Sequence, residues 1–90
     1  MSLFNKKISY SLLAKKLVNT YPDSIEIDDF GNLDYDNTVY NFACQILNNF
    51  DMNRQKYNFG TTFDGPEDCE SWIRTHLQDL YELCDSYAND

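Results

Sequence analysis

Three cysteines and a single histidine are the residues of this chain best suited to metal binding or nucleophilic catalysis. Cys69 and His76 fall in one helical pattern, where their spacing corresponds to about 10 Å along the axis, too far for one ion to bind both. The sequence has no Cys-x-x-Cys and no His-x-x-x-His pair, the spacings that are typical of zinc sites. We therefore expect no metal site and no cofactor, and we expect the thiols and His76 to be structural.

Other catalytic chemistry fits the sequence no better. Hydrolysis by a triad needs a nucleophile, a base and an orienting group, and the lone histidine lies among apolar residues of its helix. The three glycines form no phosphate-binding loop. Aligning Gly31 with the central glycine of an EF-hand puts Glu26 and Asn37 where calcium loops use Asp and Glu. We expect a protein without catalytic residues, that is, not an enzyme.

Acidic residues dominate the charge of the chain, which has a formal net charge of -8. Residues 23–36 contain six carboxylates and no base, whereas residues 1–20 hold a basic cluster with a charge of +4. Direct nucleic-acid binding needs a basic face, so this balance argues against it. Because like charges repel within a compact fold, we expect the acids to bind a partner, with plain solvation as the alternative. The candidate partner-binding residues are Glu26, Asp28, Asp29, Asp34, Asp36, Asp79, Glu82 and Asp85.

Helices are predicted on both sides of this acidic segment. Apolar residues at three- and four-residue steps predict helices over about 8–20 and 37–50. Pro22 should end the first helix, and Asp36 or Asn37 should cap the second. A third helix should begin near Pro66, where Asp64 and Glu67 have the spacing of a capping box. Its apolar stripe continues to the end of the sequence without a stop signal.

The acidic segment itself has an alternating pattern. Apolar residues alternate with acids on both sides of Gly31 and Asn32, whose types favour a turn. This predicts a β-hairpin over about 24–36, with one apolar and one acidic face. Outward side chains on a strand lie about 6.7 Å apart. The acids would then form two rows of negative charge, similar to the rows of phosphates along a nucleic acid.

The predicted elements add up to an α+β fold in a single domain, residues 1–90. Three helices would pack on a small antiparallel sheet made of the hairpin and a third strand at about 56–63. Alternation at Tyr57, Phe59, Thr61 and Phe63 suggests this strand, and a covered loop is its alternative. An all-α bundle with an acidic loop is the alternative for the whole domain.

The cellular location follows from three features of the sequence. The first helix region has no apolar run long enough for a secretory signal. No stretch approaches the roughly 20 apolar residues of a membrane span. Three cysteines, an odd number, suit reduced thiols. We expect a cytoplasmic protein that does not associate with membranes.

In size, charge and acidic hairpin, the chain resembles the short acidic phage proteins that block host defence nucleases, including anti-CRISPR and anti-restriction proteins. The resemblance implies an inhibitor that occupies a basic, nucleic-acid-binding surface of another protein, as a monomer or a homodimer. An immunity protein or antitoxin that neutralises a toxin is one alternative. A self-associating structural subunit is another, because the outer face of the 37–50 helix is uncharged (Thr38, Asn41, Gln45, Asn48 and Asn49).

Overall fold

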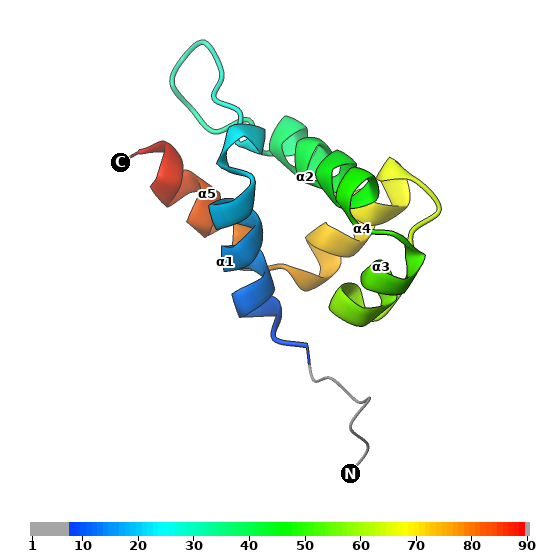
Figure 1. The fold of residues 1–90 in the computed structure, drawn as a ribbon. Helices are drawn as coiled ribbons and strands as arrows, with labels where there is room; N and C mark the ends of the chain where they lie inside the picture. The colour runs from blue at the N-terminus through cyan, green and yellow to red at the C-terminus, as the bar shows by residue number, and fades with distance from the viewer. Residues whose placement is uncertain (1–7, 90) are drawn as a thin grey trace.

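The computed structural model describes residues 8–89, which form five α-helices and one 3-10 turn (Figure 1). The elements are α1 (Tyr10–Thr20), η1 (Pro22–Ser24), α2 (Tyr35–Asn49), α3 (Met52–Phe59), α4 (Pro66–His76) and α5 (Leu80–Ala88). Within this range no strand forms, and β-type pairing is limited to an isolated bridge between Ile27 and Leu33. The predicted α+β fold is therefore wrong. The alternative, an all-α bundle with an acidic loop, agrees with the structure.

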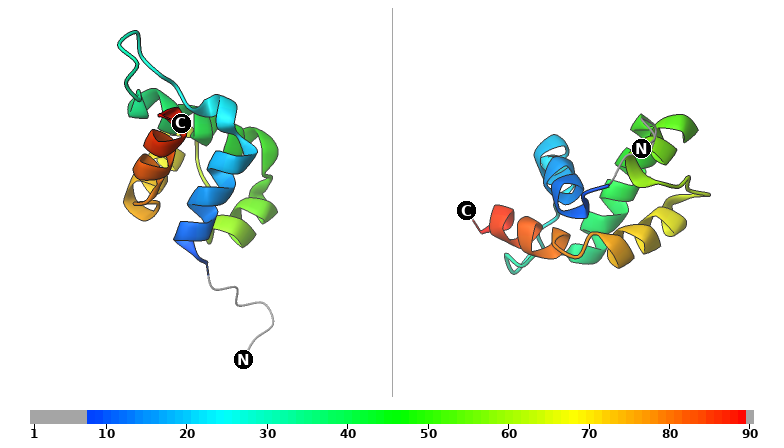
Figure 2. Two further views of the ribbon diagram at one scale, coloured as in Figure 1. Left: turned by 90° about the vertical axis from the view of Figure 1, so that its left-hand side faces the viewer. Right: turned by 90° about the horizontal axis from the view of Figure 1, so that it is seen from below.

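The helices pack in two pairs around one hydrophobic core. α2 lies against α4, and α1 lies against α5 (Figure 2). Each helix contributes buried apolar side chains, among them Leu17 of α1, Phe42 of α2, Phe59 of α3, Ile73 of α4 and Leu80 of α5. The apolar stripes predicted for the three helical regions thus meet in a single core.

α1 and α2 form close to the predicted ranges because their apolar periods are unbroken. Ser9 caps α1 by accepting a hydrogen bond from the Leu12 N–H, and the helix ends before Pro22. α2 begins two residues earlier than the predicted start at Asn37, because its N-cap is Asp34. The prediction that Asp36 or Asn37 caps this helix is wrong.

The predicted hairpin strands do not form because helical structure occupies their outer ends. Residues 22–24 turn as η1 directly after α1, and Tyr35 already belongs to α2. Asp34 uses its side chain for the helix cap, as short acidic residues often do in place of strand pairing. Only Ile27 and Leu33 remain to pair. The predicted turn is present, with Gly31 at a φ of 81°.

The predicted third strand at 56–63 is also wrong, because residues 52–59 form α3. Asp51 caps this helix by accepting from the Arg54 N–H at 2.8 Å. Gly60, at a φ of 77°, ends the helix in the left-handed conformation that favours glycine. These two caps are the sequence signals of the helix. The strand was predicted instead because aromatic residues alternate with other residues in this segment.

The predicted third helix is divided into α4 and α5 by a break at Leu77, Gln78 and Asp79. Leu77, the first residue of the break, and Leu80, the first residue of α5, are both buried. The break allows α4 to pack on α2 while α5 packs on α1. Gly65 and not Asp64 takes the N-cap position of α4, with Pro66 in its first turn, and the Asp64 N–H donates to the Asp68 carboxylate at 3.0 Å.

Candidate partner-binding surface

Residues 23–36, called the acidic loop below, project from one end of the helical bundle (Figure 1). Asp28 organises the turn, because its Oδ1 atom accepts hydrogen bonds from the N–H groups of Phe30 and Asn32, both at 2.9 Å. The Asp28 N–H donates to the Asn32 carbonyl at 2.8 Å, and the Gly31 N–H donates to the Asp28 carbonyl at 3.0 Å. Four hydrogen bonds within five residues hold this turn in one conformation.

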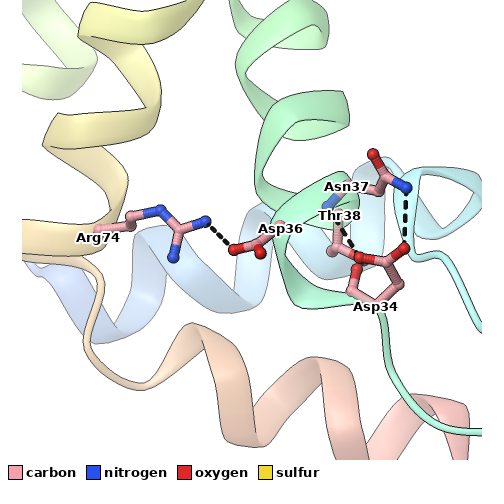
Figure 3. A network of polar contacts seen from close by, with 5 residues as sticks. All are labelled: Asp34, Asp36, Asn37, Thr38 and Arg74. Atoms are coloured by element: carbon pink, nitrogen blue, oxygen red, sulfur yellow. Dashed lines mark hydrogen bonds and ion pairs between the residues drawn. The ribbon is translucent and has the colours of Figure 1, made fainter.

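Thr38, in the first turns of α2, holds the base of the acidic loop. Its side chain is fully buried. Its hydroxyl accepts from the Glu26 N–H at 2.9 Å. The same hydroxyl donates to the Asp34 carbonyl at 2.8 Å (Figure 3). The Asp34 N–H donates in turn to the Glu26 carbonyl at 2.9 Å. The two ends of the loop are therefore joined to each other and to the helix behind them.

The acids at the loop's base also have separate local partners. The Asp34 carboxylate accepts from the Asn37 N–H and from the Asn37 side chain. Glu26 accepts from the Asn41 side chain at 3.1 Å. Asp36 pairs with Arg74 of α4 at 2.6 Å (Figure 3). The two parallel rows of charge expected for strands do not form, because these carboxylates bind different parts of the domain.

Asp23 and Asp29 differ from the other acids of the loop. Both are exposed, and neither makes a hydrogen bond or an ion pair within residues 8–89. Asp29 lies at the tip of the turn, between Asp28 and Phe30, whose N–H donates to the Asp28 side chain. These two carboxylates are thus available to a partner without any loss of internal structure.

The tip of the loop also carries Phe30, which is not among the candidate binding residues predicted from the sequence. Its side chain is 88% exposed, the highest fraction among the large exposed hydrophobic residues of the described chain. Ile27, on the same loop, is 43% exposed. The signal in the sequence was an aromatic residue inside a turn, out of phase with every apolar stripe.

The second predicted group of acids, Asp79, Glu82 and Asp85, lies on and just before α5. Asp79 and Glu82 are exposed, and Asp85 is half-buried and accepts from the Asn89 side chain. The Tyr35 and Tyr81 rings contact edge to face at 5.0 Å and so join the base of the acidic loop to the first turn of α5. In all three views the loop and α5 lie at the same end of the molecule (Figures 1 and 2). The fold therefore brings both acidic groups to one end.

Of the residues that suggested metal or thiol chemistry, Cys69 and Cys84 are buried, and Cys44 and His76 are half-buried. His76 stacks on Trp72 with ring centroids 4.5 Å apart, and its Nδ1 lies 3.0 Å from the Trp72 carbonyl oxygen. Burial raises the pKa of the Cys69 thiol to about 12, with a smaller contribution from the Asp68 charge, and that of the Cys84 thiol to about 11. Residues 8–89 contain no cluster of three or more potential metal ligands.

Two tyrosines also have shifted pKa values. Burial is the largest cause of the raised pKa of Tyr35, and the neighbouring Arg74 charge opposes it. Tyr40 has a raised pKa because its hydroxyl is hydrogen-bonded to Cys44. Both shifts favour the neutral phenol near neutral pH, so neither tyrosine adds charge to the surface described above.

Comparisons with protein-family models, with curated proteins and with solved structures find no match to this chain. None of the helices in the described range is long and apolar enough to cross a membrane.

Proposed function

We propose that this protein is an inhibitor that uses its acidic loop to bind a basic surface on another protein, of the kind that holds nucleic acid. The observation that carries the proposal is the combination at the loop tip, on a turn fixed by hydrogen bonds. Phe30 is 88% exposed there, and the neighbouring Asp29 makes no ion pair within residues 8–89. The anti-defence proteins of phages, which the chain resembles in size and charge, are the class this role fits. We place this activity in the cytoplasm.

Phe30 and the carboxylates would contribute in different ways. Burying a phenylalanine side chain in a partner's pocket gives about 1.5–3 kcal/mol, and aromatic anchors often dominate the energy of an interface. The carboxylates, in a chain of net charge -8, accelerate the encounter with a basic partner and select against acidic ones. Charge thus guides the approach, and Phe30 holds the complex.

The hydrogen bonds within the loop favour binding because they reduce the ordering that binding requires. A loop already held by Asp28 and Thr38 loses little conformational entropy when it docks. The different roles of the acids in holding the loop also determine which of them can be substituted in a binding test. Asp28 and Asp34 hold the loop and must stay, whereas Asp23, Glu26 and Asp29 can be neutralised with little change to the fold.

The test begins by immobilising the full chain and identifying the proteins it retains from a bacterial lysate. Each retained protein is purified, and its affinity is measured for the parent, for Asp23→Asn/Glu26→Gln/Asp29→Asn and for Phe30→Ala. We expect each loop variant to weaken binding by about tenfold or more. We also expect duplex DNA to displace the parent, and binding to weaken as salt is added.

The matched control removes the same charge elsewhere. Asp64, Glu67 and Glu70 lie around the first turns of α4, at the other side of the bundle from the loop (Figure 1). Their neutralisation should change affinity much less than the loop variants do. Equal losses in the two triple variants would show that only net charge matters and would overturn the proposal. A target that DNA does not displace would favour an immunity protein or antitoxin.

A further inference from the structure

A cavity of about 190 Å³ lies between α1 on one side and Phe50 and α3 on the other. Leu13, Leu17, Tyr21 and Phe50 contribute its apolar lining, and Lys16 and Arg54 contribute its charge. No acidic residue lines it. In a chain of net charge -8, this is a local reversal of sign. The cavity is also separate from the acidic loop, whose residues do not line it.

Arg54 is held in place at this cavity by two contacts. Its guanidinium donates to the Asn49 carbonyl at 2.9 Å and lies over the Phe50 ring, 5.0 Å from the ring centroid. A guanidinium has five N–H donors, so most of them remain for a ligand. Arg74 and Asp36 form the one ion pair found within residues 8–89. Within that range, therefore, no carboxylate pairs with Lys16 or Arg54.

The size of the cavity limits its ligand to a small molecule. An apolar cavity of about 150 Å³ accepts benzene, and sites for drug-sized ligands begin at about 300 Å³. A volume of about 190 Å³ therefore fits one aromatic ring with a short substituent. The two cations favour an anionic substituent, and the planar fork of an arginine matches a carboxylate.

We propose that this cavity binds a small organic carboxylate whose apolar body is about the size of one aromatic ring. The ring would pack against Leu17 and Phe50, and the carboxylate would accept hydrogen bonds from Arg54 and Lys16. This site is independent of the proposed inhibitory function, because no residue of the acidic loop takes part in it.

Phenylacetate is the probe, and phenylacetamide is its neutral control of nearly the same shape. Each is titrated into the full ¹⁵N-labelled chain, and affinity is read from the backbone amide shifts. We expect phenylacetate to shift amides of residues 16–21 and 50–58 in a saturable way. Phenylacetamide should bind about tenfold more weakly, because it lacks the charge that the two cations recognise. Equal affinity for the two compounds would overturn the proposal.

Charge-removing variants complete the test. Lys16→Gln/Arg54→Gln should weaken phenylacetate binding by about tenfold or more. Lys15→Gln/Lys56→Gln removes the same charge from the same two helices but outside the cavity lining, and should leave affinity within about twofold. Since Lys16 is exposed, the single variant Lys16→Gln should stay folded, and it should also lose affinity. If Lys15→Gln/Lys56→Gln loses as much affinity for phenylacetate as Lys16→Gln/Arg54→Gln does, then only the net charge of the protein affects binding, and the proposed site is refuted.

Discussion

The Arg74 guanidinium donates a 2.6 Å hydrogen bond to the Asp36 carboxylate, which joins the end of α4 to the first turn of α2 across 38 positions of sequence. Both side chains are substantially exposed, at 43% and 89%. The Arg74 guanidinium also lies over the Tyr35 ring, 5.6 Å from its centroid. The two charges therefore neutralise each other at this end of the molecule, although neither side chain is buried.

Asp36→Asn should lower the free energy of unfolding by less than about 1 kcal/mol, since water screens an exposed pair. Arg74→Met should cost somewhat more than Asp36→Asn, because it also removes the cation–π contact with Tyr35, worth about 0.5–1 kcal/mol. Urea unfolding of both variants measures the two values. A larger loss for Asp36→Asn than for Arg74→Met would contradict this order.

Thr38→Val should destabilise the base of the acidic loop. Valine keeps the shape of threonine but removes the hydroxyl that serves the Glu26 N–H and the Asp34 carbonyl. The Asp34 carbonyl keeps the hydrogen bond from the Thr38 N–H at 3.0 Å, whereas the Glu26 N–H loses its partner, which costs about 1–3 kcal/mol. Thr38→Ser is the matched control, because it keeps the hydroxyl and loses only a methyl group. Urea unfolding should rank serine above valine, and hydrogen exchange of the Glu26 amide should accelerate in the valine variant alone. Equal exchange in both would show that the hydroxyl does not hold the loop.

The sequence predicted α1, α2 and the start of α4 well because their apolar periods are long and their breakers are explicit, as with Pro22 and Pro66. α3 was missed although Asp51 and Gly60 mark its two ends. An alternating run of aromatic residues outweighed these caps. The break at Leu77 had no local signal, because Leu77 and Leu80 keep the apolar stripe in phase and no Pro or Gly intervenes.

The sequence predicted which acids lie in the candidate binding surface, but it did not predict how their side chains are arranged. The turn at Gly31 was foreseen, and the acids are mostly exposed as expected. Their separate roles depend on residues distant in sequence, such as Arg74 for Asp36 and Asn41 for Glu26. The periodicity of apolar residues cannot predict contacts between side chains that are so far apart in the sequence. The exposure of Phe30 follows from the same fold, because the loop extends beyond the helices that could have covered it.

The buried thiols should make the domain less stable in alkaline solution. The pKa of Cys69 is raised from 9.0 to about 12 and that of Cys84 to about 11. An acid with a raised folded-state pKa gives its full stability below the unfolded value and loses it as the pH rises toward the folded one. The thermal midpoint should therefore fall between about pH 9 and pH 11.

Cys69→Ala/Cys84→Ala should flatten that fall, whatever its effect on the midpoint at neutral pH. The comparison is of slopes, so a moderate loss of stability from the two substitutions does not obscure it. Native-state titration with a thiol reagent near neutral pH gives a second reading, in which only Cys44, which is half-buried, should react readily. An unchanged alkaline slope in the double variant would assign the pH dependence to other groups.

Gln55 offers the sharpest test of the connection between α2, α3 and α4. Its side chain is 5% exposed. Its amide donates to the Phe50 carbonyl at 2.8 Å and accepts from the Phe63 N–H at 3.0 Å. In Gln55→Glu the carboxylate keeps the second bond but places a negative charge against the Phe50 carbonyl oxygen. Burial and that oxygen should both raise the pKa of the new carboxyl above the ordinary value of about 4.3.

The stability difference between Gln55→Glu and the parent should therefore depend on pH. At about pH 3 and below, the carboxyl is protonated in both the folded and the unfolded state, its O–H can donate to Phe50, and the loss is small. As the pH rises the loss grows, and at about pH 7 it should reach about 3 kcal/mol, as for an uncompensated buried charge. Gln55→Met is the control: it lacks both hydrogen bonds at every pH, so its loss of about 1–3 kcal/mol per unpaired group should stay constant. Urea unfolding at the two pH values measures both variants against the parent. The same loss for Gln55→Glu at both values would mean that its carboxylate reaches water, and that Gln55 does not hold the junction in the way described.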